Sequence, residues 1–264
     1  MVHNAQHINI IQEHFENMEH HRFERLELLV GSDGLQRLKN ASVAVVGVGG
    51  VGSYAAEALA RAGIGRLTLI DFDRIALSNI NRQIHALEQT VGRTKVQTMA
   101  ERCLSINPKA EVRPIEAFFN ADTSAELLAG GYDYLCDCID SITAKLHLIE
   151  SCINSSIPVI SAMGAANKLD PSLIRVGDLA CTQKCRMARI MRKELGRRGI
   201  RRGLKVVYSL EEYRALNTET PQEYDTTTGH RPRVTLGSSS YIPPIFGLTM
   251  AGAVIQELLG GCRS

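Results

Sequence analysis

Apolar and polar positions follow two alternating patterns between residues 42 and 162 of the chain. Short apolar runs rich in Val, Ile and Leu predict buried parallel strands, and longer stretches with apolar residues at helical spacing predict amphipathic helices. The alternation of the two patterns predicts an α/β fold with helices on both faces of the sheet. Strands are predicted over 42–47, 66–71, 111–115, 132–138 and 157–162, and helices over 51–62, 93–106, 123–129 and 142–154.

The pattern changes after Met163, where short strands and turns replace the regular alternation. The expected fold is therefore a doubly wound, Rossmann-like, mostly parallel sheet with an irregular C-terminal extension. In that extension a helix is predicted over 185–198, a strand over 204–209, a mobile loop over 219–240 and an apolar helix over 242–259.

The two ends of the chain have different compositions. Residues 1–21 are polar and rich in histidine, without the apolar segment of a secretory signal, so a flexible leader is expected there. We expect one main domain over 22–170, completed by the basic helix, mobile loop and C-terminal helix of 171–264. Prolines, Gln256 and Glu257 interrupt the apolar stretch 242–259, whose uninterrupted part is shorter than the roughly 20 residues of a spanning helix. No membrane association is expected.

A glycine-rich turn joins the first predicted strand to the first predicted helix, with glycines at Gly47, Gly49, Gly50 and Gly52. Glycines there permit a tight turn and let backbone N–H groups approach phosphates at the positive end of the helix. Asp71 lies 24 residues beyond Gly47, at the end of the second strand, where a carboxylate can accept hydrogen bonds from ribose hydroxyls. The turn lacks the Lys-Ser or Lys-Thr pair of a P-loop. It indicates a nucleotide and leaves a nicotinamide-dependent oxidoreductase as an alternative.

Further polar residues are expected at the carboxyl edge of the same sheet, where ligands bind in such folds. Attack of a carboxylate on the α-phosphorus of ATP brings two anions together. Cations must offset that repulsion and the charge on the departing pyrophosphate. A dehydrogenase has no use for so many phosphate-facing charges, so the set favours ATP with Mg²⁺. The residues concerned are Asp73, Asn79, Arg82 and Gln83 after the second strand, Lys95 at the start of a helix, and Asp140 after the fourth strand.

These residues form part of a set of motifs shared with a known family. Over residues 22 to about 170 the chain resembles the E1-like activating enzymes, which include ubiquitin-activating enzyme and the molybdopterin and thiamine biosynthesis adenylyltransferases. The motifs are Arg22-Phe23-Glu24-Arg25, the glycine turn, Asp71-Phe72-Asp73, Ser78-Asn79 with Arg82-Gln83, Gly92 with Lys95-Val96, and Asp137-Cys138-Ile139-Asp140.

The resemblance implies an ATP-binding adenylation domain over 22–170. In it, Asp71 would hold the ribose, while Asn79, Arg82 and Lys95 would contact phosphates. Asp140 would serve Mg²⁺ and pyrophosphate. Arg25 would reach the ATP of a partner subunit, which implies a homodimer and completes a catalytic set of Arg82, Lys95, Asp140 and Arg25.

Charge is distributed unevenly along the chain. The total is +2, but the segment from Lys184 to Lys205 alone carries +9, so the remainder carries −7. Such a concentration favours a polyanionic partner, with RNA as the natural candidate. Met187, Ile190, Met191 and Leu195 are expected to anchor the helix and leave its cations outward. The residues expected to bind this RNA are Arg186, Arg189, Arg192, Lys193, Arg197 and Arg198.

The seven cysteines are scattered, which favours reduced thiols in a cytoplasmic protein. The molybdopterin and thiamine branches carry two Cys-x-x-Cys pairs for structural zinc. In this chain the corresponding pattern is a single pair, Cys181 and Cys185, with three residues between them instead of two. No structural zinc is therefore expected. Cys136 and Cys138 share a predicted strand face and are expected in the core, and no cysteine stands out as a nucleophile.

Nearly the whole chain resembles one branch of the family, the tRNA threonylcarbamoyladenosine dehydratases. The resemblance implies ATP-dependent cyclisation of N6-threonylcarbamoyladenosine in tRNA through an acyl-adenylate, with release of AMP and pyrophosphate. Because the ring closure is intramolecular, effective molarity can replace a catalytic cysteine. The motifs that carry this resemblance lie at 50–53, 57–61, 79–83, 167–171 and 192–195.

Two further alternatives stay open at this point. One is adenylation of the C-terminus of a small ubiquitin-like sulfur-carrier protein, against which the missing zinc pairs and the basic segment count. The other is a non-catalytic RNA-binding scaffold, against which the intact set of Asp71, Arg82, Lys95 and Asp140 counts. The sequence leaves open whether a desulfurase partner delivers sulfur to a cysteine and whether a monovalent cation binds.

Overall fold

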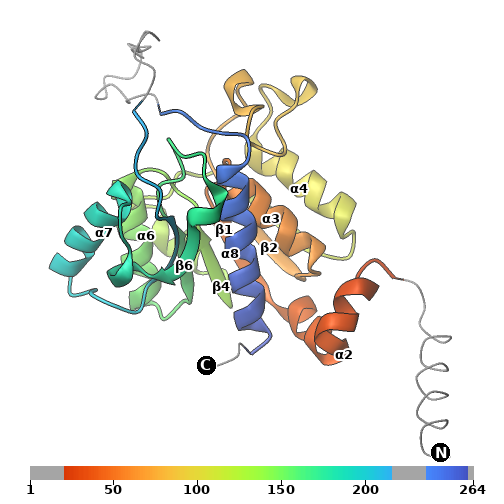
Figure 1. Ribbon diagram of the computed structural model, residues 1–264. Helices are drawn as coiled ribbons and strands as arrows, with labels where there is room; N and C mark the ends of the chain where they lie inside the picture. Colours follow the sequence, from red (N-terminus) through yellow and green to blue (C-terminus); the bar gives the residue numbers. More distant parts are fainter. Residues whose placement is uncertain (1–20, 216–235, 261–264) are drawn as a thin grey trace, which may run out of the picture.

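The computed structural model describes residues 21–215 and 236–260. Their strands form one sheet of seven, in the order β3-β2-β1-β4-β5-β7-β6, with helices against both faces (Figure 1). Neighbouring strands are parallel except at the edge, where β6 pairs antiparallel with β7. The strand order reverses between β1 and β4, which is where ligands bind in doubly wound sheets. The predicted Rossmann-like α/β fold is thus confirmed.

The strands are short, and those at the centre of the sheet are buried. Successive residues of β1 point to opposite faces, so Val43 and Val45 enter one hydrophobic core and Ala44 and Val46 enter another. The strands are β1 (Ser42–Val46), β2 (Arg66–Ile70), β3 (Glu111–Ile115), β4 (Tyr134–Asp137), β5 (Val159–Ala162), β6 (Ile174–Asp178) and β7 (Lys205–Ser209).

The helices form the two outer layers. On one face, α3 (Gly52–Arg61), α4 (Lys95–Ile106) and α8 (Ile242–Leu258) bury Leu59, Met99 and Phe246 against the sheet. On the other face lie α5 (Ser124–Leu128) and α6 (Ile142–Asn154), with α7 (Arg186–Arg197) packed beside α6. Outside these layers are α2 (Glu24–Asn40) and the 3-10 turns η1 (Leu77–Asn79), η2 (Glu88–Thr90), η3 (Pro171–Leu173) and η4 (Leu179–Cys181).

Helices α3 and α8 pack closely side by side. A Cβ atom added at Gly247 of α8 would lie 2.2 Å from the carbonyl oxygen of Val51, at the start of α3. Glycine is therefore required for this approach, which brings the first turn of α8 against the glycine turn. Within 21–215 and 236–260, none of the helices combines the length and apolar character needed to span a bilayer.

Most predicted elements agree with the observed ones. The predicted helix 142–154 and strand 111–115 coincide with α6 and β3, and the others differ only at their ends. The basic helix predicted over 185–198 and the strand predicted over 204–209 are both present, as α7 and β7. Strand β7 and its neighbour β6 belong to the same sheet as β1 to β5. All of the predicted leader 1–21 except His21, and most of the predicted loop 219–240, lie outside the described residues.

One expectation about α7 is wrong. Ile190 was expected to anchor the helix, but it is 43% exposed. The buried positions are Ala188, Met191 and Leu195, which lie three and four residues apart on one face. Ile190 lies outside that face, and the small side chain of Ala188 allows α7 to approach its neighbours.

Candidate active site

The glycine turn lies at the carboxyl end of β1, and its geometry requires glycine at two positions. Gly47 has a φ of 89°, a left-handed conformation that favours glycine, and a Cβ there would lie 2.9 Å from the carbonyl group of Cys138. A Cβ at Gly52 would lie 1.8 Å from the carbonyl oxygen of Gly47. Among the described residues no side chain caps the N-terminus of α3, and the backbone N–H of Ser53 donates to the carbonyl oxygen of Gly49 at 3.0 Å. The positive end of the helix thus points at the glycine turn, where an anion can bind.

Asp71 supports this turn directly. Its carboxylate accepts hydrogen bonds from the backbone N–H of Val48 at 2.6 Å and of Asp73 at 2.8 Å. Burial raises the pKa of Asp71, against the lowering effects of Lys95 and of the two backbone donors. Asp71 thus ties the end of β2 to the glycine turn, and its oxygens face the same edge of the sheet as the turn.

Asp73 and Lys95 form an ion pair beside Asp71. The Nζ of Lys95 lies 2.6 Å from an oxygen of Asp73, and the Lys95 side chain is only 7% exposed, against 46% for Asp73. The backbone N–H of Lys95 also donates to the carbonyl oxygen of Asp73. The two residues are 22 positions apart in the sequence, and the fold brings their side chains into contact.

The segment from η1 to Gln83 wraps over the glycine turn. The Oδ1 of Asn79 accepts from the backbone N–H of Ala76, and its carbonyl oxygen accepts from Arg82 and Gln83, so Asn79 organises this segment. The Gln83 side chain is buried beside Gly49, and its Oε1 has no partner among the described residues. The segment places Arg82 and Gln83 directly against the turn.

Arg82 and Asp140 complete the crevice. The stem of Arg82 lies over Gly50, with its Cγ 3.2 Å from where a Cβ of Gly50 would be. Burial lowers the pKa of Arg82, and the negative charge of Asp140 opposes that effect. Asp140 is exposed and makes no hydrogen bond or ion pair with any residue in the described ranges.

A buried triad that sequence reasoning missed lies one layer below. Asp137 accepts from Lys145 Nζ at 2.7 Å and from Ser161 Oγ at 2.6 Å, and Lys145 also donates to Ser161 at 3.1 Å. All three residues are completely buried. The triad joins β4, α6 and β5 just below the loop that carries Asp140. The only sequence signal was a lysine at an otherwise apolar position of the predicted helix.

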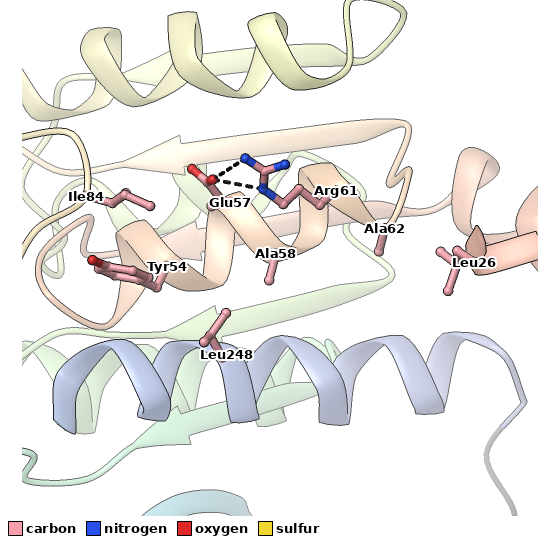
Figure 2. A pocket seen from close by; sticks show the side chains of 8 residues that line it. All are labelled: Leu26, Tyr54, Glu57, Ala58, Arg61, Ala62, Ile84 and Leu248. Atoms are coloured by element: carbon pink, nitrogen blue, oxygen red, sulfur yellow. Dashed lines mark hydrogen bonds and ion pairs between the residues drawn. The ribbon is translucent and has the colours of Figure 1, made fainter. Parts of the chain in front are cut away.

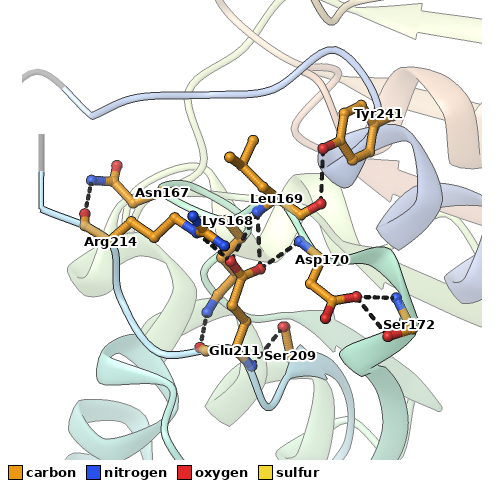
Figure 3. Close-up of polar contacts among 9 residues, drawn as sticks. All are labelled: Asn167, Lys168, Leu169, Asp170, Ser172, Ser209, Glu211, Arg214 and Tyr241. Carbon is orange, nitrogen blue, oxygen red and sulfur yellow. Dashed lines mark hydrogen bonds and ion pairs between the residues drawn. The ribbon is translucent and has the colours of Figure 1, made fainter. Parts of the chain in front are cut away.

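A second polar cluster holds the loop after β5 (Figure 3). The Glu211 carboxylate accepts from the backbone N–H groups of Leu169 and Asp170 and from Arg214 Nε. Lys168 is buried and donates to the carbonyl oxygen of Glu211, and burial lowers its pKa. The sequence marked residues 167–171 only as a branch motif; their partner Glu211 is 42 residues away from Leu169.

The basic segment lies on α7, and its six predicted cations differ in their surroundings. Arg189 and Lys193 are exposed, lie one helical turn apart and make no polar contact within the described part of the chain. The other four are held by neighbours: Arg186 lies 3.8 Å from the ring centre of Tyr213, Arg192 donates to the Thr182 carbonyl at 2.8 Å, and Arg197 and Arg198 pair with Glu194 at 2.9 Å and Glu150 at 3.2 Å.

Arg25 does not lie at the site of its own chain. It is on the first turn of α2, where the neighbouring Phe23 packs against Gly63, just beyond the C-terminal end of α3. The glycine turn lies at the opposite end of that helix. Figure 1 likewise shows α2 remote from the carboxyl edge of the sheet. Arg25 could therefore serve a nucleotide only in a second subunit.

Four cysteines of the described residues are held in the thiol form by burial. Cys136 is buried in β4, and Cys138 is half-buried one residue beyond its end. Burial raises the pKa of both thiols, and raises that of Cys103 and Cys152 to about 12. No cluster of three or more His, Cys, Asp or Glu side chains suited to a metal ion occurs within 21–215 and 236–260.

Comparisons with known proteins agree with this geometry. Residues 23–263 match the ThiF family. The chain is 41% identical to the tRNA threonylcarbamoyladenosine dehydratase of Bacillus subtilis over 241 residues, which cover 90% of this chain and 95% of that protein. A molybdopterin-synthase adenylyltransferase of Salmonella typhimurium is 37% identical over 56% of this chain and 59% of its own length.

Solved structures show the same relationship. The Escherichia coli tRNA N6-threonylcarbamoyladenosine dehydratase in complex with ATP superimposes with a TM-score of 0.79 at 35% identity, covering 90% of this chain and 94% of that one. Its complex with AMP matches with the same TM-score. The chain therefore belongs to the ThiF family, in the branch of the tRNA threonylcarbamoyladenosine dehydratases.

Proposed function

We propose that the protein cyclises N6-threonylcarbamoyladenosine in tRNA at the expense of ATP. The observation that carries the proposal is the convergence of Arg82, Lys95 and Asp140 on the glycine turn, in a chain whose near full-length relative is named as this dehydratase. The ATP and AMP complexes of the E. coli enzyme support ATP as the substrate.

In the first step, the threonyl carboxylate attacks the α-phosphorus of ATP and pyrophosphate leaves. The glycine-turn N–H groups and α3 bind phosphate oxygens, and Asp71 orients the ribose. Gln83, Asn79 and Asp73 line the same crevice. Arg82 and the remaining N–H donors of Lys95 stabilise the charge that gathers on pyrophosphate.

Asp140 fits a role as Mg²⁺ ligand. Its carboxylate is exposed at the carboxyl edge and makes no polar contact with the described residues. Mg²⁺ prefers oxygen ligands and is held by one or two carboxylates together with substrate phosphates. Bound there with ATP, Mg²⁺ would neutralise phosphate charge.

In the second step, the carbamoyl group of the same nucleoside attacks the acyl-adenylate carbonyl and AMP leaves. The nucleophile and the activated carbonyl are tethered to one base, so the high effective molarity of an intramolecular reaction drives the closure. The nucleoside loses one water in total, which ATP takes up as its α–β bond is cleaved. The protein need supply no cysteine nucleophile.

The exposed cations of α7 would bind the tRNA backbone. Arg189 and Lys193 are available for phosphates, whereas Arg197 already has Glu194 as its partner. Replacing Arg189 and Lys193 with alanine should weaken tRNA binding and reduce its salt dependence. The variant Arg197→Ala is the matched control and should change both less.

A homodimer would supply Arg25 to each site. Helix α2 exposes Leu28 by 50% and Leu29 by 84%. Its Leu26 lines an apolar depression together with residues of α3 and α8 (Figure 2). A second copy offers matching leucines and explains why they face outward. The depression is lined by Leu26, Tyr54, Ala58, Ala62, Ile84 and Leu248, with Glu57 and Arg61 at its polar side.

The direct test is incubation of the purified protein with ATP, Mg²⁺ and tRNA that carries the uncyclised nucleoside, followed by mass spectrometry of the nucleosides. Loss of one water, dependent on ATP, is expected. An unchanged nucleoside mass would overturn the proposal.

The variant Asp140→Ala tests the site assignment. It should abolish the reaction and leave tRNA binding intact, whereas surviving turnover would show that the assignment is wrong.

Adenylation of a sulfur-carrier protein is the second candidate, and it has the weaker support. The matches to molybdopterin-synthase adenylyltransferase cover little more than half of the chain. That function predicts pyrophosphate exchange that depends on a carrier peptide and not on tRNA.

A cytoplasmic location fits the free thiols of the described cysteines. A desulfurase partner would require an accessible cysteine, such as the exposed Cys181.

A further inference from the structure

We propose that Asn81 is a positioning residue for Arg82, and that it couples the Arg82 guanidinium to the backbone segment that leads into α8. This inference rests on the proposed function, because it assigns Arg82 to the phosphates of ATP. It assigns to Asn81 a role separate from that of Asn79, which organises the backbone of the same segment.

The oxygen and the nitrogen of the Asn81 side-chain amide each form a hydrogen bond. Its Oδ1 accepts from Nη1 of Arg82 at 2.7 Å, and its Nδ2 donates to the carbonyl oxygen of Ser238 at 3.0 Å. Ser238 is 157 residues away in the chain. A single amide therefore connects the arginine to a distant part of the backbone.

Arg82 is held in a way that leaves one side of its guanidinium available. Its stem lies over Gly50, where Pro243 of α8 also packs. Its Nη1 donates to both Asn81 and the Ser78 carbonyl oxygen, the latter at 3.0 Å. Nε and Nη2 donate to no acceptor within 21–215 and 236–260. A guanidinium binds a phosphate well when two of its donors point the same way. Asn81 and Ser78 fix that orientation by occupying Nη1.

The backbone on the other side of Asn81 is itself firmly anchored. The Gly237 carbonyl accepts from the backbone N–H of Asn167 at 2.8 Å, and the Ser239 hydroxyl accepts from the N–H of Ile242 at 3.1 Å. The hydroxyl of Tyr241 donates to the carbonyl oxygen of Leu169 at 2.8 Å (Figure 3). Asn81 thus ties Arg82 to a segment that the Asn167–Leu169 loop holds in place.

A double-mutant cycle between Asn81 and Arg82 tests this role on the full-length protein. Asn81→Ala should lower kcat/KM for ATP in tRNA-dependent AMP release by up to about 100-fold, because a small misplacement of a catalytic group has an effect of that size. In an Arg82→Ala background the same change should have almost no further effect, since Asn81 acts through Arg82. Equal effects in both backgrounds would overturn the inference.

Asn81→Leu provides a second cycle if the alanine variant folds poorly. The leucine side chain keeps roughly the same volume but can neither accept from Arg82 nor donate to Ser238. It should weaken ATP binding in calorimetry, and the loss should disappear when Arg82 is alanine. A loss that persists without Arg82 would contradict the proposal.

Two controls separate this inference from the proposed function. Gln97→Ala removes an exposed amide of α4 with only a long contact to Glu101, at 3.5 Å, and should leave kcat/KM unchanged. Calorimetry of the wild-type protein with ATP and Mg²⁺ needs no tRNA. If the wild type binds no ATP, the proposed function fails; if it binds and cyclises but the cycles are additive, only the role of Asn81 fails.

Discussion

Two lysine–aspartate pairs lie at the carboxyl edge of the sheet, and they have nearly the same length. Lys145 and Asp137 are 2.7 Å apart, and Lys95 and Asp73 are 2.6 Å apart. The first pair is completely buried, whereas the Asp73 side chain is 46% exposed. The pairs therefore share their chemistry and differ in their access to solvent and ligands.

Their surroundings explain the difference in role. The first pair is closed, because Ser161 donates to Asp137 and accepts from Lys145. A buried ion pair is tolerated when such hydrogen bonds satisfy its remaining groups. Lys95 has one carboxylate partner and faces the crevice of the glycine turn. The same two residue types thus form a structural element in one place and a candidate phosphate site in the other.

Removing the cation of the closed pair should have the largest effect. Lys145→Met leaves Asp137 buried without its counter-charge, and this should lower the free energy of unfolding by about 3–5 kcal/mol. Urea unfolding of wild type and variant measures it. Adding Asp137→Asn removes the stranded charge and should recover part of the loss. A loss below about 1 kcal/mol would contradict the role assigned to the pair.

Removing the cation of the open pair should affect catalysis and not folding. Lys95→Met should lower the rate of ATP-dependent AMP release by about 10²–10³, the usual effect of losing one charge-stabilising donor. The free energy of unfolding should fall by only about 1 kcal/mol or less, because the partner is partly exposed. Lys109→Met, at an exposed position after α4, is the control. Near-normal turnover of Lys95→Met would remove Lys95 from the site.

A pH dependence of stability is expected from His85, a buried residue whose pKa is affected by Lys95 of the open pair. Burial lowers the pKa of His85 to about 4, with further lowering by the charges of Lys95 and Arg102. The unfolded chain takes up a proton near its ordinary pKa of about 6.5, while the folded protein does not until about pH 4. Folding therefore loses stability as the pH falls through this window, by about 2 kcal/mol at pH 5.

Urea unfolding at pH 7 and pH 5 measures this loss. In His85→Phe the part of the pH dependence due to this group should vanish. An identical pH dependence in wild type and variant would show that His85 is protonated normally in the folded protein.

The smallest effect is expected from Ser161→Ala. Asp137 keeps Lys145 and the backbone N–H of Ile139 as donors. The ion pair therefore remains, and only the two hydrogen bonds of the neutral Ser161 hydroxyl are lost. The free energy of unfolding should fall by about 1 kcal/mol. Ser105→Ala, which removes an exposed hydroxyl bonded to the Glu101 carbonyl, is the matched control and should cost less. A loss as large as that of Lys145→Met would place the hydroxyl at the centre of the triad.

Local sequence patterns were sufficient for most of the fold. The run Glu111–Ile115 and the helical spacing of Ile142–Asn154 predicted β3 and α6 to the residue. Hydrophobic periodicity and glycine spacing act within a few residues, so one sequence contains them. The resemblance to a known family supplied the expected roles of Arg82, Lys95 and Asp140, and their carboxyl-edge placement followed from the alternation of strands and helices.

The contacts between distant segments were decided only by the tertiary structure. In the sequence, Lys145 is one residue of a predicted helix. Its burial in an ion pair depends on β4 and β5, which place Asp137 and Ser161 around it. The exposure of Ile190 depended on which face of α7 meets its neighbours. Asn81 gained Ser238 as a partner only because the chain returns to the glycine turn before α8. Such pairings depend on how layers pack, and residues far apart in sequence carry no local signal of their partners.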